Sequence, residues 1–574
     1  MPRCTALSLL LLCLPLAAQS TTAREAEMTA HVAQAIREWV TEFERGRLQP
    51  KATLRRASDL QPNYVRTARQ AGFVAEGDEG RITHLDMLGK LLFHAERNGT
   101  PEIAEAVLGV AAIGFEGAFL DLQAHELREL GHWTLMRIES QGAWFLVLRA
   151  AAGKSVFLPG LPAGEPQPST EGLSVGPARR VAALQLIGRR NLPVFRSTLE
   201  AAFVDADPRI RLAAAEAMAP PWRAETVRCV AAALGKERHP VVSQALVRTL
   251  LSMLKSPPHE LVAEERGFLV DGALQQFGRC GWQTDMDLLD VIAAFPHKRA
   301  IPVLIEALDL NATGKDTLVE LVNKRASPMR RERAIGLLRA MTGALLADDD
   351  VVGWRAFWAR EQDRIVVPQQ LARETPGGTR ATFFGVPVTG GSIGFLIDTS
   401  GSMESAPATQ PETGPRRRRE ATRLMAAKEQ LVLAAQAMQP ESHYYVFTFA
   451  DRARSWTATP IQPGRRSLGS LTELLSRLSP HGGTNIHDGL QTALQWGERR
   501  YGEMAATRID ELFVLTDGEP TAGAVTDTDD LLELVRESNK YAKVRIHAVF
   551  TGTGKGAEWL RKLAEENGGV YVQR

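Results

Sequence analysis

Short apolar runs in the last third of the chain limit what this sequence can fold into. From residue 391 onward, SIGFLID, HYYVFTFA, ELFVLTD, RIHAVFTG and VYVQR alternate with segments whose apolar residues recur at three- and four-residue steps. Most of the runs lack the polar alternation of a strand with one solvated face, which predicts a sheet covered on both sides. Strand–helix alternation of this kind is typical of a doubly wound, mostly parallel, Rossmann-like α/β domain.

Two of these runs end in an aspartate. Asp398 ends the first run and Asp517 ends the third. Parallel strands end at the same edge of a sheet, and ligands bind beyond that edge where the strand order reverses. Ser400 and Ser402 follow the first aspartate, and Thr484 lies in a glycine-rich turn before a helix. We expect these five side chains on one rim, where their oxygen atoms favour one Mg²⁺, Mn²⁺ or Ca²⁺ ion over zinc.

The spacing of these residues resembles a known motif. Asp398-x-Ser400-x-Ser402, a downstream Gly-Gly-Thr484 and a strand-ending Asp517-Gly are similar to the metal-ion-dependent adhesion site of von Willebrand factor A domains. The resemblance covers residues 391–574. It implies one divalent cation, with both serines and the threonine as near ligands and the aspartates contacting directly or through water. It also implies that an acidic group of a protein partner completes the coordination shell, while Thr399 serves the turn.

Three other interpretations of the rim compete with the metal site. An aspartic protease needs a second carboxylate-bearing motif to share a proton with Asp398, and none is present. A hydrolase with Ser400 as nucleophile and His481 or His487 as base lacks the glycines of a nucleophile elbow. In a metal-free sheet the aspartates would only cap loops. Asp488 lies shortly after Thr484. We expect its carboxylate to be a charge at the start of a helix rather than a ligand of the metal.

The loop after the motif holds the run Arg416–Arg419. The run is interpreted either as a solvated loop face, the commoner role of such runs, or as an electrostatic landing patch for an acidic partner.

The first 20 residues have the pattern of a secretory signal peptide. Arg3 precedes an apolar stretch over residues 6–16 and then small residues, the three-part layout of a signal peptide. The stretch is shorter than the about 20 residues of a membrane span. We therefore expect a secreted, periplasmic or envelope protein with no integral membrane span after cleavage. Without Arg3, 67 basic residues balance 67 acidic ones, so no overall charge attracts nucleic acid.

Helical segments fill the middle of the chain. RRVAALQLIG at 179, PRIRLAAAEAM at 208 and HPVVSQALVRTL at 239 recur at a spacing of about 31 residues, which suits an α-solenoid. They resemble HEAT repeats, and the whole arrangement is similar to secreted bacterial proteins that join such repeats to a von Willebrand factor A domain. The predicted organisation is a signal peptide (1–20), a helical N-terminal region (21–157), a linker (158–177), HEAT-like repeats (178–365), a linker (366–390) and the α/β domain (391–574).

Two further sequence features do not change the predicted function. Gly153-Lys154-Ser155 follows a strand-like run and resembles the end of a phosphate loop, but position 148 is leucine where such a loop needs glycine. Cys229 and Cys280 are the cysteines left after signal removal, and the sequence leaves open whether they pair.

The sequence therefore predicts a non-enzymatic interaction or adhesion protein that holds a divalent cation and, through it, an acidic group of a partner. The alternative is an envelope scaffold whose helical repeats do the binding while the metal is only structural. A hydrolase using Asp398 or Ser400 is the remote alternative.

Overall fold

The computed structural model describes residues 23–55, 61–75, 77–117, 119–154, 175–308, 327–371, 381–406, 422–440, 442–497, 499–503, 507–554 and 556–574. The predicted signal segment, most of the first predicted linker and the run Arg416–Arg419 lie outside these residues. The chain forms two compact units, Met1–Ile113 with Leu127–Leu186, and Gly114–Glu126 with Ile187–Arg574. The domain boundaries expected from the sequence stay predictions.

The first unit is helical in its described residues. Helix α2 packs against α3 and α5, and α5 packs against α7. The run before Gly153, expected to be a strand, lies in α7, so that expectation is wrong: Trp144, Val147 and Ala151 are buried at helical spacing. The helices up to this point of the chain are α2 (Ala23–Glu44), α3 (Asn63–Gln70), α4 (His84–Arg97), α5 (Pro101–Ala111), α6 (Leu122–Arg137), α7 (Gln141–Ala151) and α8 (Pro177–Arg190). The first residues of α6 and the last residues of α8 belong to the second unit.

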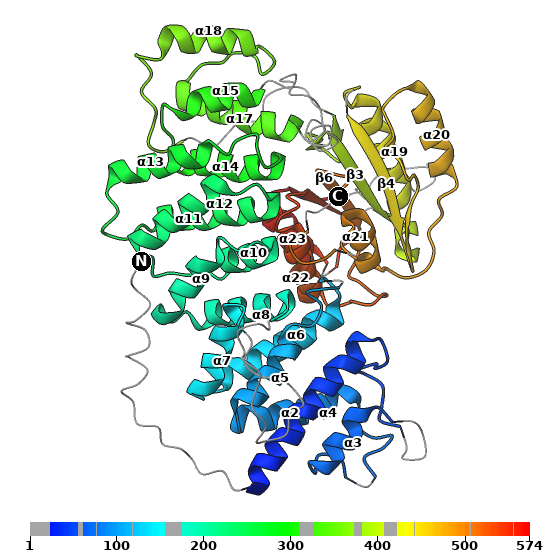
Figure 1. Ribbon diagram of the computed structural model, residues 1–574. Helices are drawn as coiled ribbons and strands as arrows, with labels where there is room; N and C mark the ends of the chain where they lie inside the picture. Colours follow the sequence, from blue (N-terminus) through cyan, green and yellow to red (C-terminus); the bar gives the residue numbers. More distant parts are fainter. Residues whose placement is uncertain are drawn as a thin grey trace. The chain divides into compact units, whose positions relative to one another are not determined.

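The second unit begins with a stack of helices in two rows. One row runs α9, α11, α13, α15 and α18, and the other runs α10, α12, α14 and α17, each helix contacting the next in its row. This is the packing of a solenoid, coloured cyan to green in Figure 1. Pro208 and Pro240 begin α10 and α12, where a missing backbone N–H costs nothing. The helices are α9 (Arg196–Ala202), α10 (Pro208–Glu216), α11 (Ala224–Lys236), α12 (Pro240–Lys255), α13 (Ala263–Leu274), α14 (Trp282–Ala294), α15 (Ala300–Leu308), α17 (Ser327–Thr342) and α18 (Val351–Glu361).

The end of this unit is the α/β domain that the apolar runs predict. Among the described residues its main sheet has the order β5-β4-β3-β6-β7-β8, and every pair is parallel except β4–β5. The sequence did not predict β5 or the separate β1–β2 hairpin, which are only two or three residues long. The strands are β1 (Thr382–Phe383), β2 (Val386–Pro387), β3 (Ser392–Asp398), β4 (His443–Phe449), β5 (Ala453–Ser455), β6 (Glu511–Thr516), β7 (Arg545–Phe550) and β8 (Tyr571–Gln573).

Both faces of the sheet are covered, as predicted. On one face Phe395 and Phe513 join a core with Leu431 and Leu471 of helices α19 and α20. Their strand neighbours point the other way, into a second core with helices α21, α22 and α23, because successive side chains of a strand alternate between faces. Each fully buried leucine or phenylalanine stabilises the fold by about 1.5–3 kcal/mol. The helices are α19 (Arg423–Ala437), α20 (Arg465–Ser476), α21 (Ile486–Leu494), α22 (Thr528–Asn539) and α23 (Ala557–Glu566).

The described residues include both cysteines that remain after the predicted signal peptide. Cys229 and Cys280 are both free thiols. No described helix combines the length and the apolar composition that a membrane span requires.

A largely buried glutamate, whose side chain is 14% exposed, joins the solenoid to the α/β domain within the second unit. Glu216, at the end of α10, accepts hydrogen bonds from the Lys540 ammonium (2.6 Å) and from the hydroxyls of Tyr501 (2.6 Å) and Tyr541 (2.7 Å). Figure 1 shows α10 beside α22, after which Lys540 follows. Burial would raise the pKa of Glu216, but Lys540 and the hydroxyls outweigh it and hold that pKa below its usual value. The carboxylate is therefore charged and anchors the contact.

Replacing this glutamate should weaken the second unit. Glu216→Ala leaves the ammonium and two hydroxyls without their acceptor, and we expect a loss of about 3 kcal/mol, the low end for a broken buried ion pair, because the Lys540 side chain keeps 33% exposure. Calorimetric melting of the full chain measures it. Glu558→Ala, at a side chain 81% exposed, is the control and should cost less than about 0.5 kcal/mol. Equal effects of the two changes would contradict the anchoring role.

A second buried network ties β3 to β6 at the edge of the sheet where these strands begin. Asp510 accepts backbone N–H groups of Gly391 (2.9 Å) and Ser392 (3.1 Å). Glu511 accepts hydrogen bonds from the Thr389 hydroxyl (2.7 Å) and from the His547 ring (3.1 Å). Burial, with a further contribution from the Glu511 charge, raises the pKa of Asp510 to about 7.

This shift makes stability depend on pH. Because the folded-state pKa lies above the unfolded value of about 3.8, the contribution of Asp510 is fully present below pH 4 and is lost as pH rises through 7. Relative to Asp510→Asn, the wild-type chain should lose stability between pH 4 and pH 7.5, by about 1.4 kcal/mol for each unit of pKa shift. Melting of both proteins at each pH measures this. A stability difference that stays constant over that range would contradict the prediction.

Candidate functional site

The strand order reverses between β3 and β6. The chain passes from β3 to β4 on one side and later returns to β6 on the other side. Crevices at such reversals, beyond the carboxyl ends of the strands, are where open α/β sheets bind ligands. Asp398 is the last residue of β3, and Asp517 directly follows β6. The two aspartates therefore lie at the predicted rim.

Asp398 is fully buried at this rim. Its Oδ1 accepts the backbone N–H of Ser400 (2.7 Å) and its Oδ2 accepts the Thr516 hydroxyl (2.6 Å). Burial raises the pKa of Asp398 to about 6, against the opposing effect of these hydrogen bonds. Thr516 was not anticipated from the sequence, although it immediately precedes Asp517. Both carboxylate oxygens of Asp398 are thus held in place by neighbouring residues.

The two serines connect to Asp517 through hydrogen bonds. The Ser400 and Ser402 hydroxyl oxygens lie 3.1 Å apart, and the Ser402 hydroxyl donates to Asp517 Oδ1 at 2.8 Å. The Ser400 side chain is nearly buried. Ser400, Ser402 and Asp517 therefore form one continuous cluster of oxygen atoms, and Asp398 adjoins it through the N–H of Ser400.

Thr484 comes to the same place through its loop. The backbone N–H of His481 donates to Thr399 O (2.8 Å), and that of Gly401 donates to Gly482 O (3.1 Å), so the glycine-rich loop lies on the serine-bearing loop. Gly482 has a φ of +68°, a conformation that favours glycine. Thr484 is 4% exposed, and its N–H donates to the Thr521 hydroxyl. The structure thus places its loop at the rim, without a hydrogen bond from its hydroxyl to the four others.

Two nearby residues contact the surroundings of the site. Thr399 donates both its N–H (2.8 Å) and its hydroxyl (3.0 Å) to Phe449 O, so it ties the loop after β3 to the end of β4. Asp488 lies in the first turn of α21, and its Oδ2 accepts the N–H of Ala453 at 2.7 Å. Both side chains point to the frame of the site rather than to the oxygen cluster.

An arginine that sequence reasoning missed also contacts the cluster. Arg423, the first residue of α19, donates from Nη1 to Asp517 Oδ2 at 2.6 Å and to Ser402 O at 3.3 Å. The exposed fractions of the two side chains are 13% and 1%. No sequence signal distinguishes this arginine from others, because it follows a loop whose path the sequence does not define.

The chemistry of this donor set fits a hard divalent cation. The set offers two carboxylates and three hydroxyls, and oxygen ligands of this kind suit Mg²⁺, Mn²⁺ or Ca²⁺. Among the described residues no group of three His, Cys, Asp or Glu side chains could hold a metal, so a zinc-type site is not formed there. The Ser402 hydroxyl, which donates to Asp517, and the Ser400 hydroxyl beside it add neutral oxygen donors to the two carboxylates.

The described residues do not pair Ser400 with a histidine. Its hydroxyl forms a hydrogen bond with the Ser402 hydroxyl. His481 Nδ1 lies 2.9 Å from Ser479 O, and the His487 ring packs against Trp496. The arrangement expected of a serine hydrolase is therefore not seen in this part of the chain.

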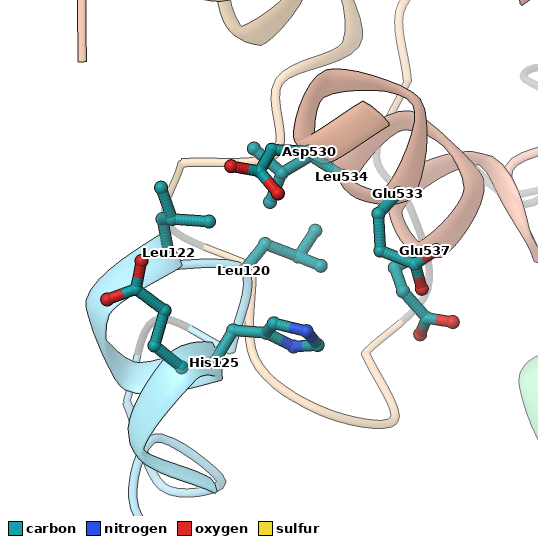
Figure 2. A pocket seen from close by; sticks show the side chains of 8 residues that line it. Leu120, Leu122, His125, Asp530, Glu533, Leu534 and Glu537 are labelled. Carbon is teal, nitrogen blue, oxygen red and sulfur yellow. The ribbon is translucent and has the colours of Figure 1, made fainter. Parts of the chain in front are cut away.

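A pocket whose lining includes none of the five rim residues is drawn in Figure 2. Figure 2 shows the His125 ring turned toward Glu533 and Glu537, with Leu120 between it and Asp530. Burial raises the pKa of Glu537. The acidic side chains do not converge into a metal site, and no hydroxyl of the oxygen cluster lines the pocket. Its lining residues come from the segment before and within α6 and from α22: Leu120, Leu122, His125, Glu126, Asp530, Glu533, Leu534 and Glu537.

Comparison with known proteins identifies the domain that carries the rim. A family model described as "von Willebrand factor type A domain" matches residues 393–519, the segment that carries the rim. Mouse "Inter alpha-trypsin inhibitor, heavy chain 4" is 25% identical over 187 residues, 32% of this chain and 18% of that protein. Human "Inter-alpha-trypsin inhibitor heavy chain H4" is 25% identical over 183 residues, 31% and 18% of the two chains. The matched segment thus spans less than a fifth of these relatives.

Solved structures give weaker likenesses. "von Willebrand factor type A from Catenulispora acidiphila" has 22% identity and a TM-score of 0.24, covering 32% of this chain and 38% of that one. The Deinococcus radiodurans RO (RSR) protein has 15% identity and a TM-score of 0.19, covering 92% and 94%. Similarity at these scores supports no conclusion about function.

Proposed function

We propose that this protein is a metal-dependent interaction protein, in which the von Willebrand factor A domain holds one divalent cation and uses it to bind an acidic group of a partner. The observation that carries the proposal is the continuous oxygen cluster of Ser400, Ser402 and Asp517 beside the buried carboxylate of Asp398, at the reversal point of the sheet. Carboxylates and hydroxyls gathered at one crevice are the hard oxygen ligands that Mg²⁺, Mn²⁺ and Ca²⁺ prefer.

The five residues would have different roles in holding the cation. Ser400 and Ser402, with Thr484 from the opposite loop, would be the near ligands, and the two aspartates would supply charge directly or through water. A bound cation would give the site a positive centre able to accept an anionic ligand. Mg²⁺ is the favoured ion, because it keeps exchangeable waters that an incoming carboxylate can replace. The partner is then a protein that offers an aspartate or glutamate.

The rest of the chain suggests where such binding would happen. The predicted signal peptide favours a secreted, periplasmic or envelope location, and relatives that match part of the chain include inter-alpha-trypsin inhibitor heavy chains. The two rows of stacked helices offer a second surface for partners. The alternative proposal is therefore a scaffold in which the HEAT-like solenoid binds the partner and the metal only stabilises its own domain.

Mg²⁺ should stabilise the α/β domain. A ligand that binds only the folded state adds about 2.7 kcal/mol at a concentration one hundred times its Kd. Melting of the full chain in EDTA and in excess Mg²⁺ should show a rise in Tm with Mg²⁺. Asp517→Ala should abolish the rise, while Asp488→Asn, at a helix-start aspartate outside the cluster, should preserve it. Identical melting of the wild-type chain in both buffers would argue against the metal site.

Partner capture should depend on the same cation. Immobilised full chain, incubated with an envelope or culture-fluid extract, should retain partners in Mg²⁺ and release them in EDTA, and Asp517→Ala should capture none. Retention that is unchanged by EDTA and by Asp517→Ala would favour the scaffold alternative, because the solenoid would then be the binding surface.

A further inference from the structure

We infer that Arg423 is a built-in competitor for the divalent cation: its guanidinium neutralises Asp517 in the metal-free domain, and the cation has to bind against this charge. The inference rests on the proposed function and adds a regulation of the same site. It concerns a residue that no part of the metal-site motif includes.

The placement of Arg423 is specific to the oxygen cluster. A single nitrogen, Nη1, donates both to Asp517 Oδ2 and to the carbonyl oxygen of Ser402. The 2.6 Å contact is at the short end for a charge-assisted hydrogen bond. Arg423 Nε is buried and has no hydrogen-bond partner. The guanidinium is therefore held by its contacts to the site, and not by a full set of structural partners elsewhere.

Competition follows from how Asp517 is shared. Its Oδ1 accepts the Ser402 hydroxyl and its Oδ2 accepts Arg423, so both oxygens have partners without a metal. With both aspartates ionised, the cluster carries a charge of −2 from carboxylates and +1 from Arg423. A divalent cation that uses Asp517 would meet a like charge on the same carboxylate, in a place where the Asp517 side chain is only 1% exposed. Repulsion between charges is weakly screened at such sites.

The consequence is that the cation must reach a higher concentration before it binds the site. The pair satisfies the buried carboxylate in the metal-free domain, so the site does not need metal to remain folded. Binding then requires that the guanidinium leave Asp517 or that its charge be tolerated beside the ion. Either route lowers the affinity for the cation compared with the same oxygen atoms alone. The adhesive state would form only where the divalent cation is abundant.

Direct binding measurements test the competition. Mn²⁺ serves as probe, and electron paramagnetic resonance of the free ion gives its Kd for the full chain. Arg423→Gln removes the charge and should bind Mn²⁺ more tightly, by about tenfold or more. Arg423→Lys keeps the charge and should stay within about threefold of the wild-type chain. Arg466→Gln, which removes an exposed arginine of α20, is the matched control and should leave the Kd unchanged.

A second measurement needs no metal. In EDTA, Arg423→Gln should lower the Tm, because it leaves Asp517 buried without a counter-charge. Adding Asp517→Asn to Arg423→Gln should recover part of this loss, so the two changes should be non-additive. Additive effects in this cycle would overturn the inference, because the pair would then not be coupled.

The outcomes separate the inference from the proposed function. If the wild-type chain binds Mn²⁺ and Arg423→Gln binds it equally or more weakly, the inference is wrong and the metal site stands. If Arg423→Gln binds Mn²⁺ and the wild-type chain does not, the inference is supported in its strongest form. If none of the proteins binds Mn²⁺ and Asp517→Ala behaves like the wild-type chain, the proposed function fails and the competition falls with it.

Discussion

The parallel pairing of β3 with β6 is the constraint on which the rest of the site depends. Ile393 pairs with Glu511 and Ile397 with Leu515, so the two strands run in register to the same edge. This register brings Asp398 and Asp517, which are far apart in the sequence, to neighbouring strand ends. A slip of one residue would turn every side chain of a strand to the opposite face. In the observed register the Thr516 hydroxyl at the end of β6 donates to Asp398 Oδ2 at the end of β3, at 2.6 Å.

Strand β6 has a different role at each end. At its start, Glu511 receives the Thr389 hydroxyl and the His547 ring, and Arg545 connects this network to Glu332 of the solenoid at 3.5 Å. At its other end, the strand delivers Thr516 and Asp517 to the oxygen cluster. The solenoid is thus anchored to one end of the strand whose other end forms the site. A rigid strand held in this way keeps the ligands of the site preorganised.

Local charge, and not overall charge, governs this rim. The chain is close to neutral, with 68 basic and 67 acidic residues, so long-range attraction does not select a partner. Within the rim the balance is set by two carboxylates and by Arg423. Burial raises the pKa of Asp398, because desolvation penalises the charged carboxylate, and the charge of Asp517 adds to this effect. A partner carboxylate would therefore respond to the few groups at the rim and to the cation they hold.

The sequence by itself determined the α/β class, the positions of the main strands along the chain and which oxygen-bearing residues lie at the strand ends, because apolar periodicity and motif spacing are local properties of the chain. It did not determine β5 and the β1–β2 hairpin, whose two- and three-residue strands exist only through their partners. The strand-like run before Gly153 became a helix because its apolar residues fit one helical face. The contact of Arg423 with Asp517 was decided only by the tertiary structure, since it joins residues 94 positions apart. Packing of α19 on the sheet puts that arginine at the rim, and nothing in the neighbouring sequence encodes that distance.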